Sequence, residues 1–487
     1  MVLRNKLFVS SAIVFGLLAA TNLTDSVSQA ATIIGVVSDE NGDPIEGALI
    51  TATPKQNNGG NASKKKVYTD PEGAYEIEGI KKGKHKLTIE SGGYEKATET
   101  LMITNKKEEV EKDFTLTFSI YSKITNTESM DAAVASFKEI DTLRKTGTAT
   151  GEVVVKAGND IETTYEGDLR NLAKEVDEKN NLNLDGDILS AIDDYKTENQ
   201  PALASQVIDK TLKRVFYLAL LKRITDVYDN FHTAKISELK FLWDDAYAAY
   251  QALIALADKE NKVITEDRLS IETGSNPNLE DQIMVAFIRG QKALKRKKPD
   301  EDRITLGIQR QIIRISLVRA FYIGVLREAG GVLSNRDANP ARALVNQKEG
   351  EVYYRAIEAF ISRDNPEGNE TIKSQLTGDL ADVDADSMVS ELSKGFMGRV
   401  RGELESNATA INASNRDSAI ITAEEALHYS KIFLEDLNIR LSTEDSEVLV
   451  DALNALRDAS NRVDDTNAAA ARLTISTILD GYKSELP

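Results

Sequence analysis

The chain contains one distinctive stretch twice, and the two copies decide how its larger part is expected to fold. Residues 319–327 read RAFYIGVLR, and residues 214–222 read RVFYLALLK. Each copy places seven uncharged residues between two basic ones, inside a longer stretch of helical periodicity. Repetition of this kind is typical of stacked helical units that cannot bury their apolar faces alone. The two stretches therefore predict a helical-repeat or bundle architecture.

The repetition continues beyond these two stretches. The helices expected at residues 243–253, 349–357 and 424–432 each combine acidic residues with Tyr and aliphatic residues. The tetrapeptide SNRD occurs at residues 334–337 and again at 414–417, where each copy is expected to open a helix. We therefore expect a large all-α domain at residues 167–487, with antiparallel helix pairs repeated at about 202–258, 307–362 and 396–441.

The segment that precedes this domain has mixed signals. Residues 131–144 have helical periodicity, whereas residues 152–156 read EVVVK and are followed by Gly158 and Asn159. β-Branched residues next to turn formers favour strands. Residues 119–166 are thus predicted to form a connector with a short β excursion.

The N-terminal region has a different period. Between residues 32 and 118, short runs of alternating polar and apolar residues are separated by turn formers, for example at residues 41–44 and 70–73. About seven short strands at this spacing predict an antiparallel β-sandwich at residues 31–118.

This region resembles a known family. Residues 35–48 read GVVSDENGDPIEGA and residues 69–94 read TDPEGAYEIEGIKKGKHKLTIESGGY, a pattern of turn glycines and alternating apolar residues similar to that of the carboxypeptidase regulatory-like domain. The resemblance implies an immunoglobulin- or transthyretin-like sandwich and a non-catalytic accessory module. Such modules are common in exported bacterial proteins, where they serve adhesion, spacing or carbohydrate contact.

The first residues predict export. Arg4 and Lys6 precede an apolar run at residues 7–20, and residues 28–30 read SQA, a small-x-small cleavage site. Residues 1–30 are therefore interpreted as a signal peptide, with a retained N-terminal anchor as the alternative. Later segments carry a charge every few residues, so no membrane span is expected after cleavage. The expected location is the periplasm, the cell surface or the medium.

Composition excludes several classes of function. The formal net charge is −18, and phosphate backbones need clustered Lys and Arg, so a nucleic-acid partner is not expected. The chain has no Cys, which excludes disulfides and thiolate metal sites. Its three His lack the His-x-x-Glu and His-Glu-x-x-His patterns of zinc peptidases, and no nucleophile elbow, Walker loop or dinucleotide fingerprint occurs. We therefore predict no catalytic residues and no enzyme activity. The alternative that motifs leave open is a carboxylate-only glycosidase, which needs only two placed acids.

One pair of side chains has the spacing used in di-iron helical bundles. Glu425 and His428 lie one helical turn apart, and Glu349 and Glu351 occupy a corresponding place in the preceding repeat. These four residues are the candidate metal ligands. A complete site of this type needs a second Glu-x-x-His, which the chain lacks, so a partly exposed surface pair is the simpler interpretation.

A second candidate set has the spacing of a calcium loop. Asn183, Asp185, Asp187 and Asp194 place oxygen atoms at alternate positions, as calcium requires. Ile188 stands where the loop needs glycine, so helix-capping acids are the alternative. No cofactor is expected. If these two sets of residues bound a metal ion, it would be calcium or iron.

These observations lead to one functional hypothesis and one alternative. The leading hypothesis is an exported, non-catalytic binding or structural protein, with the sandwich as accessory module and the helical domain as interaction scaffold for a protein or cell-surface polysaccharide. The alternative is an extracytoplasmic protein that handles a metal or another ligand through the Glu425 and His428 pair.

Overall fold

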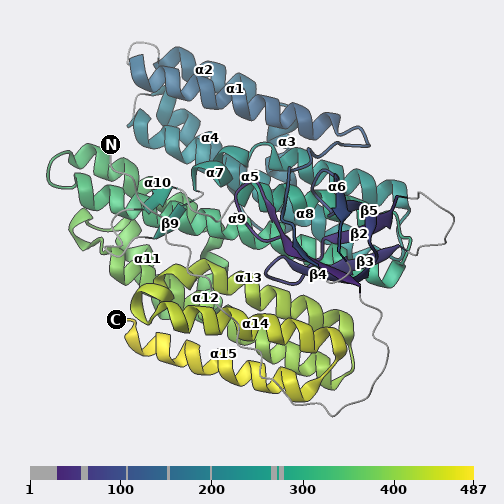
Figure 1. Cartoon of the computed structure of the whole chain (residues 1–487). Helices are drawn as coiled ribbons and strands as arrows, with labels where there is room; N and C mark the ends of the chain where they lie inside the picture. The colour runs from purple at the N-terminus through teal and green to yellow at the C-terminus, as the bar shows by residue number, and fades with distance from the viewer. Residues whose placement is uncertain are drawn as a thin grey trace, which may run out of the picture.

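The chain folds into a β-sandwich followed by a helical domain (Figure 1). The computed structural model describes residues 30–55, 64–105, 108–150, 154–197, 200–260, 262–264, 271–273 and 279–487. The predicted signal peptide therefore lies outside the described residues, except for residue 30. No described helix is both long and apolar enough to cross a bilayer.

Two sheets form the sandwich. The first sheet has the order β3-β2-β5-β6 and is antiparallel throughout, and in the second β4 pairs antiparallel with β1. The strands are β1 (Ala31–Asp39), β2 (Leu49–Pro54), β3 (Lys65–Tyr68), β4 (Ala74–Ile80), β5 (Gly83–Glu90), β6 (Ala97–Ile103), β7 (Glu109–Glu111) and β8 (Phe114–Leu116).

One detail of the predicted sandwich was wrong. Strands β7 and β8 both run parallel to β1, beside its first and second half respectively, so the sandwich is not purely antiparallel. After β6 the chain crosses from the first sheet to the second. Strands β7 and β8 then run in the same direction as β1. The period-two pattern itself is confirmed, because His85, Leu87 and Ile89 of β5 all point into the core.

The helical domain begins earlier than the sequence indicated. Residues 154–165 form helix α2 (Val154–Tyr165), and residues 128–150 form α1 (Glu128–Thr150), so the predicted connector with a β excursion is wrong for the described residues. Val154, Ala157, Ile161 and Tyr165 are buried at helical spacing, and α2 packs against α1 and α4. Burial of this face outweighs the weak strand preference of its β-branched residues.

The remaining helices complete the predicted all-α domain. They are α3 (Asp168–Asn180), α4 (Leu184–Lys196), α5 (Pro201–Asp229), α6 (Ile236–Tyr250), α7 (Ile254–Lys259), α8 (Leu279–Ala293), α9 (Pro299–Asn335), α10 (Pro340–Asp364), α11 (Pro366–Thr377), α12 (Ala385–Asn412), α13 (Arg416–Arg440), α14 (Thr443–Arg462) and α15 (Asp465–Glu485), with a 3₁₀ turn at Leu380–Asp382. A short hairpin of β9 (Lys262–Ile264) and β10 (Ile271–Thr273) was not anticipated.

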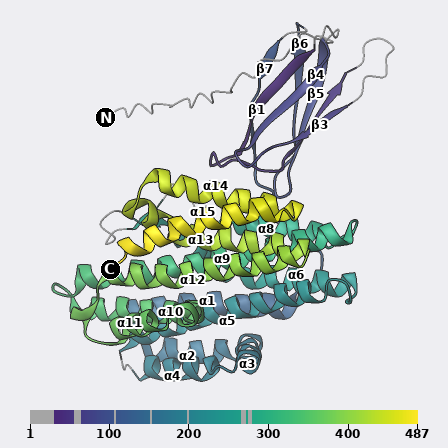
Figure 2. The same ribbon diagram turned by 90° about the horizontal axis from the view of Figure 1, so that it is seen from below.

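The first and the last helices lie on opposite sides of the domain. Figures 1 and 2 show α1 to α4 on one side of the domain and α14 and α15 on the other. A single hydrophobic core extends from Tyr121 to Leu486, so the described helices form one domain.

The two Phe-Tyr stretches lie in this core as expected. The ring of Tyr217 in α5 is 5.1 Å from that of Phe321 in α9, and Phe321 in turn lies 6.0 Å from Tyr353 in α10. The predicted helix pairs correspond to α5 and α6, α9 and α10, and α12 and α13, each of which packs together. Their origin as internal repeats stays a prediction.

The two SNRD tetrapeptides have different roles. Asn415 caps α13, since its side chain accepts a hydrogen bond from the backbone N–H of Ser418. Ser334 and Asn335 instead close α9, where their side chains donate to carbonyls one turn back. The next helix, α10, follows Asn339, whose side chain caps it by accepting a hydrogen bond from the backbone N–H of Arg342, with Pro340 in the first turn.

The connector between the domains is fixed by one buried carboxylate. Asp244 of α6 accepts hydrogen bonds from the hydroxyl of Tyr121 at 2.5 Å, the backbone N–H groups of Ile124 and Thr125 at 2.7 and 2.8 Å, the Thr125 hydroxyl at 2.8 Å and the Gln291 amide at 3.3 Å. The chain therefore leaves the sandwich along a defined path.

Candidate functional site: a cavity between the sandwich and the helices

A cavity of about 930 Å³ lies where the loops of the sandwich meet the helical domain. The loop at residues 39–47, with Tyr94 and Phe118, forms one wall, and α8, α9, α13 and α14 form the other. Figure 2 shows the sandwich standing on this part of the helical domain with its loops directed at the helices. The volume is within the range of small-molecule sites, and both domains contribute to the lining.

The sandwich wall is held in place by local hydrogen bonds and by contact with α8. The carboxylate of Asp39 accepts from the backbone N–H groups of Asn41 and Asp43 at 2.9 and 3.0 Å, which fixes the first loop. Arg289 of α8 donates from Nε to the carbonyl of Gly92 at 2.9 Å. Gly93 has φ +93° and lies so close to Val285 that a Cβ atom would come within 2.7 Å of it. The loop that contains Gly92 and Gly93 therefore contacts α8 through its backbone.

Two further contacts join the domains. The side chain of Asn41 donates to Asp281 of α8 at 3.0 Å, and Arg457 of α14 pairs with Glu46 at 2.9 Å.

Part of the helical wall is apolar. Ile304, Ile308 and Ile312 recur every four residues on one face of α9 and line the cavity. Leucine and isoleucine side chains of α13 and a valine of α14 extend this surface, namely Ile420, Leu427, Leu434 and Val450. A ligand in the cavity therefore meets an apolar surface on the helical side.

Polar groups converge from the same face of α13. Glu424, His428 and Lys431 lie at positions i, i+4 and i+7 and all line the cavity. Glu424 lies 3.8 Å from His428 Nε2 and 3.8 Å from Arg457. Burial raises the pKa of Glu424. Burial, reinforced by Lys431 and Arg457, lowers the pKa of His428 well below its usual value, so its imidazole is neutral at neutral pH.

Two cations of the cavity interact with carboxylates only at longer range. Among the described residues, neither Lys431 nor Arg289 forms an ion pair, whereas Arg319 pairs with Glu435 and Arg416 pairs with Glu301 at 3.0 Å. Burial lowers the pKa of Lys431, an effect that Glu424 and Asp43 oppose and that Arg319 and Arg457 reinforce.

The four predicted metal ligands are not brought together. His428 lines the cavity, whereas Glu425 lies 3.5 Å from Arg314 and Glu351 forms an ion pair with Arg355 at 2.5 Å. Glu349 belongs to a separate buried cluster. Within the described ranges, no three carboxylate or imidazole side chains are placed to hold a metal ion. The geometry therefore does not form the di-iron arrangement that the spacing suggested.

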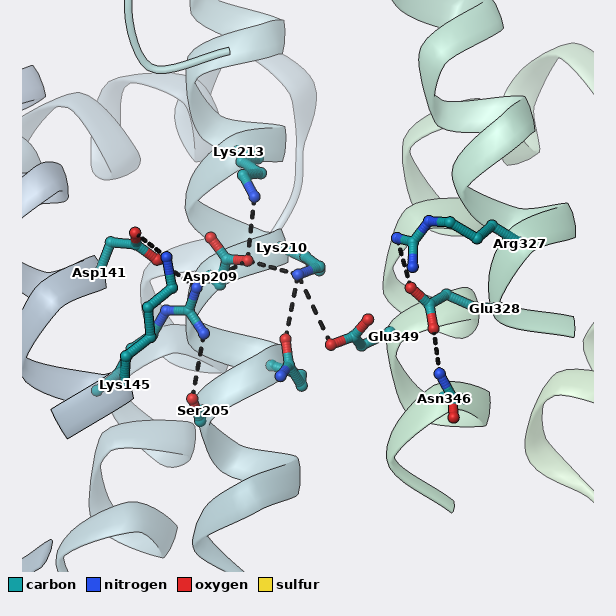
Figure 3. Close-up of polar contacts among 12 residues, drawn as sticks. Asp141, Lys145, Ser205, Asp209, Lys210, Lys213, Arg327, Glu328, Asn346 and Glu349 are labelled. Carbon is teal, nitrogen blue, oxygen red and sulfur yellow. Dashed lines mark hydrogen bonds and ion pairs between the residues drawn. The ribbon is translucent and has the colours of Figure 1, made fainter. Parts of the chain in front are cut away.

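The cluster that contains Glu349 lies inside the helical domain (Figure 3). Asp209 of α5 is surrounded by Lys210, Lys213 and Arg144 at 2.5, 3.0 and 3.1 Å. Although burial opposes it, these cations lower the pKa of Asp209 well below its usual value. Lys210 also lies 3.9 Å from Glu349. These charges neutralise one another across α1, α5 and α10, so we interpret the cluster as structural.

The predicted calcium loop is wrong, because its residues belong to a helix. Asn183 precedes α4, and Asp185, Asp187 and Asp194 lie within it. Side chains two positions apart on a helix point about 200° apart and cannot converge on one ion. Asp185 instead accepts from the hydroxyl of Tyr165 at 2.9 Å and from Arg170 at 3.1 Å.

Sequence reasoning missed most of the cavity. Three of its basic residues lie on three different helices, and none of them belongs to a sequence motif: Arg289, Lys431 and Arg457. The one available signal was the acidic turn at residues 39–46, which the family pattern marks as a loop.

Comparison with known proteins concerns the sandwich alone. Neither the curated proteins nor the solved structures give a match to the chain. Residues 32–117 match the family model described as the carboxypeptidase regulatory-like domain. This match agrees with the two described sheets and their turn glycines. The sandwich is a carboxypeptidase regulatory-like domain, and a helical domain follows it in the chain.

Proposed function

We propose that the protein is an exported, non-catalytic binding protein whose ligand lies in the cavity between the sandwich and the helical domain. The observation that carries this proposal is the cavity of about 930 Å³ with an apolar face on α9 and convergent polar groups on α13. A cavity of this size that combines an apolar face with convergent polar groups is characteristic of ligand sites. In this arrangement the regulatory-like domain forms one wall of the site.

Export and the absence of catalysis are supported by the sequence. Residues 1–30 have the charged, apolar and small-x-small regions of a signal peptide. The regulatory-like domain is by itself an accessory module, and the motifs of common nucleophile and zinc hydrolases do not occur in the chain. Binding, rather than turnover, is the function that these features favour.

The test is a thermal-shift screen of the mature chain with three compound sets: neutral oligosaccharides, acidic sugars and short peptides. A ligand that binds only the folded state at about 100 times its Kd stabilises it by about 2.7 kcal/mol. Ile308→Trp places a large side chain in the cavity, and Leu473→Trp adds the same side chain at an exposed site on α15.

The proposal expects at least one compound that raises the Tm of the wild type and of Leu473→Trp but not that of Ile308→Trp. It is wrong if no compound raises the Tm, or if every active compound acts equally on both variants. Circular dichroism of Ile308→Trp checks that the variant folds. Should it fail to fold, Ile312→Phe provides a smaller obstruction on the same face.

A further inference from the structure

The two sheets of the sandwich carry charges of opposite sign on their outer faces. The sheet β3-β2-β5-β6 has four exposed lysines on its outer face, a surface that we call the basic face: Lys55, Lys66, Lys84 and Lys86. The other sheet has four exposed glutamates on its outer face: Glu76, Glu78, Glu109 and Glu111. A surface with four lysines is unusual for a chain whose formal net charge is −18.

Threonine hydroxyls lie between the lysines of the basic face. In the strand register, Lys66 of β3 lies beside Thr51 of β2. Lys86 of β5 lies between Thr53 of β2 and Thr100 of β6. Because neighbouring strands are about 4.8 Å apart, each of these hydroxyls is one strand spacing from an ammonium-bearing side chain.

Lys55 extends this pattern from the end of β2. Its backbone N–H donates to the carbonyl of Lys84 at 2.8 Å, and its Nζ donates to the hydroxyl of Thr100 on β6 at 2.9 Å. The side chain therefore crosses β5, the strand that carries Lys84 and Lys86. Three of the four lysines thus lie close together on one exposed surface.

Nearby acidic residues leave most of this charge unpaired. Glu90 is the one acid at an outward position of the four strands, and Lys96 pairs with it at 2.6 Å. The glutamates of β4 lie near the β3 edge, next to Lys66. Within the described ranges, the other three lysines of the basic face form no ion pair: Lys55, Lys84 and Lys86.

The composition of the basic face favours one class of partner. Its large exposed apolar side chains, Tyr68 and Met102, lie on opposite edge strands, and its centre consists of Thr and Lys. Protein partners usually need aromatic or apolar anchors at the centre of the interface, and membrane surfaces need large apolar side chains that insert. Lysines that alternate with hydroxyls instead suit a hydrated chain with repeated anionic groups.

We propose that the basic face binds an acidic polysaccharide, whose carboxylate groups pair with the lysines and whose hydroxyls contact the threonines. This inference shares with the proposed function only the export of the chain and assigns a second surface, outside the cavity. The strands extend away from the helical domain (Figure 2), so a long polymer can lie along the sheet. The acidic remainder of the chain repels such a polymer and thereby directs it to this face.

Biolayer interferometry of the full mature chain tests this with immobilised polymers. Polygalacturonate and hyaluronate carry carboxylates at different spacings, and dextran is the neutral reference. The proposal expects at least one of the two acidic polymers to bind and dextran not to bind. The affinity for the acidic polymer should fall by about tenfold or more between about 50 and 200 mM salt, because exposed charges are screened.

Paired substitutions locate the polymer on the chain. Lys84→Gln together with Lys86→Gln removes two exposed charges from the basic face and is expected to weaken binding by about three- to tenfold. Lys174→Gln together with Lys179→Gln removes the same charge from exposed positions of α3 and should leave binding unchanged.

The other outcomes overturn the inference. If neither acidic polymer binds, or if both paired variants bind it equally well, the basic face is a solvated surface only. Binding to phosphatidylglycerol vesicles but not to the polymers would make the partner a lipid surface. Self-association that Glu109→Gln together with Glu111→Gln abolishes would make the partner the acidic face of a second copy.

Ile308→Trp separates this inference from the proposed function. The variant obstructs the cavity and should leave binding of the acidic polymer unchanged, because none of the four lysines lines the cavity. Loss of polymer binding in Ile308→Trp would place the polymer in the cavity and contradict the inference. A compound screen without any hit would refute the cavity as a ligand site and leave the result for the basic face as it stands.

Discussion

Burial determines the ionisation of individual side chains in this protein, and the carboxyl pair of Glu403 and Glu425 shows it clearly. Glu403 of α12 is buried beside Glu425 of α13, and burial together with the neighbouring carboxylate raises the pKa of Glu403 to about 8. Arg399 donates to Glu403 at 2.8 Å and limits this shift. Two carboxyl groups so close cannot both ionise without cost.

The pair predicts a pH-dependent stability. An acid whose pKa is higher in the folded than in the unfolded chain stabilises the fold fully below the unfolded value of 4.5, and this contribution is lost as the pH rises through about 8. The loss amounts to about 1.4 kcal/mol per pH unit within this window. Glu403→Gln cannot ionise, so urea unfolding at several pH values should show a flatter decline of its free energy of unfolding.

Glu405→Gln is the control for this prediction. Glu405 lies on the exposed face of the same helix, so its substitution should leave the pH dependence of the wild type unchanged. Equal slopes for the wild type and for Glu403→Gln between about pH 5 and pH 8 would show that Glu403 ionises normally in the folded chain.

At the scale of elements, the connector after the sandwich depends on Asp244. Residues 121–125 have no regular secondary structure, and their path is set by hydrogen bonds to this one side chain of α6. Tyr121 also stacks on Tyr247, with ring centroids 4.1 Å apart. The connector therefore belongs to the packed helical domain.

Asp244→Ala should release the connector. The substitution leaves the Tyr121 hydroxyl and two backbone N–H groups without their acceptor, and we expect the helical domain to lose about 3 kcal/mol or more of its free energy of unfolding. Urea unfolding measures the loss, and limited proteolysis should cleave near residues 121–125 more rapidly than in the wild type.

Asp229→Ala provides the comparison, because Asp229 is exposed at the end of α5 and its removal should change stability by no more than about 0.5 kcal/mol. If both variants were equally stable and equally resistant to protease, Asp244 would not fix the connector.

The elements also show which structural features the local sequence pattern predicts. Helix ends at Asn339, Asn415 and Pro299 were predictable, because caps and prolines act on their own few residues. Helix α2 was not, because its strand-forming residues adopt a helix only when the face with Ile161 and Tyr165 is buried.

At the scale of the whole molecule, the sandwich and the helical domain have separate hydrophobic cores. The described contacts between them include polar ones, such as those of Arg457 with Glu46 and of Arg289 with Gly92, and the packing of Gly93 on Val285. Interfaces of this kind permit relative motion of domains, and opening of the sandwich would give a ligand access to the cavity.

Separate cores predict two unfolding transitions. Differential scanning calorimetry of the mature chain should show two heat-absorption peaks, and residues 31–118 expressed alone should unfold near one of them. Glu46→Gln removes the charge on the exposed side of the contact with Arg457 and should move neither peak by more than about 2 °C, since such ion pairs contribute little. A single peak that Glu46→Gln lowers strongly would instead show one cooperative unit.

The sequence by itself determined the two-domain order, the strands of the sandwich and nearly all of the helices, because alternation, helical period, turns and caps are properties of neighbouring residues. Only the tertiary structure decided where the cavity lies and which charges face it. Arg457 and Glu46 are 411 positions apart, and Arg289 and Gly92 are 197 apart. No local pattern relates such residues, and the burial that changes the ionisation of Glu424, His428 and Lys431 exists only in the folded chain.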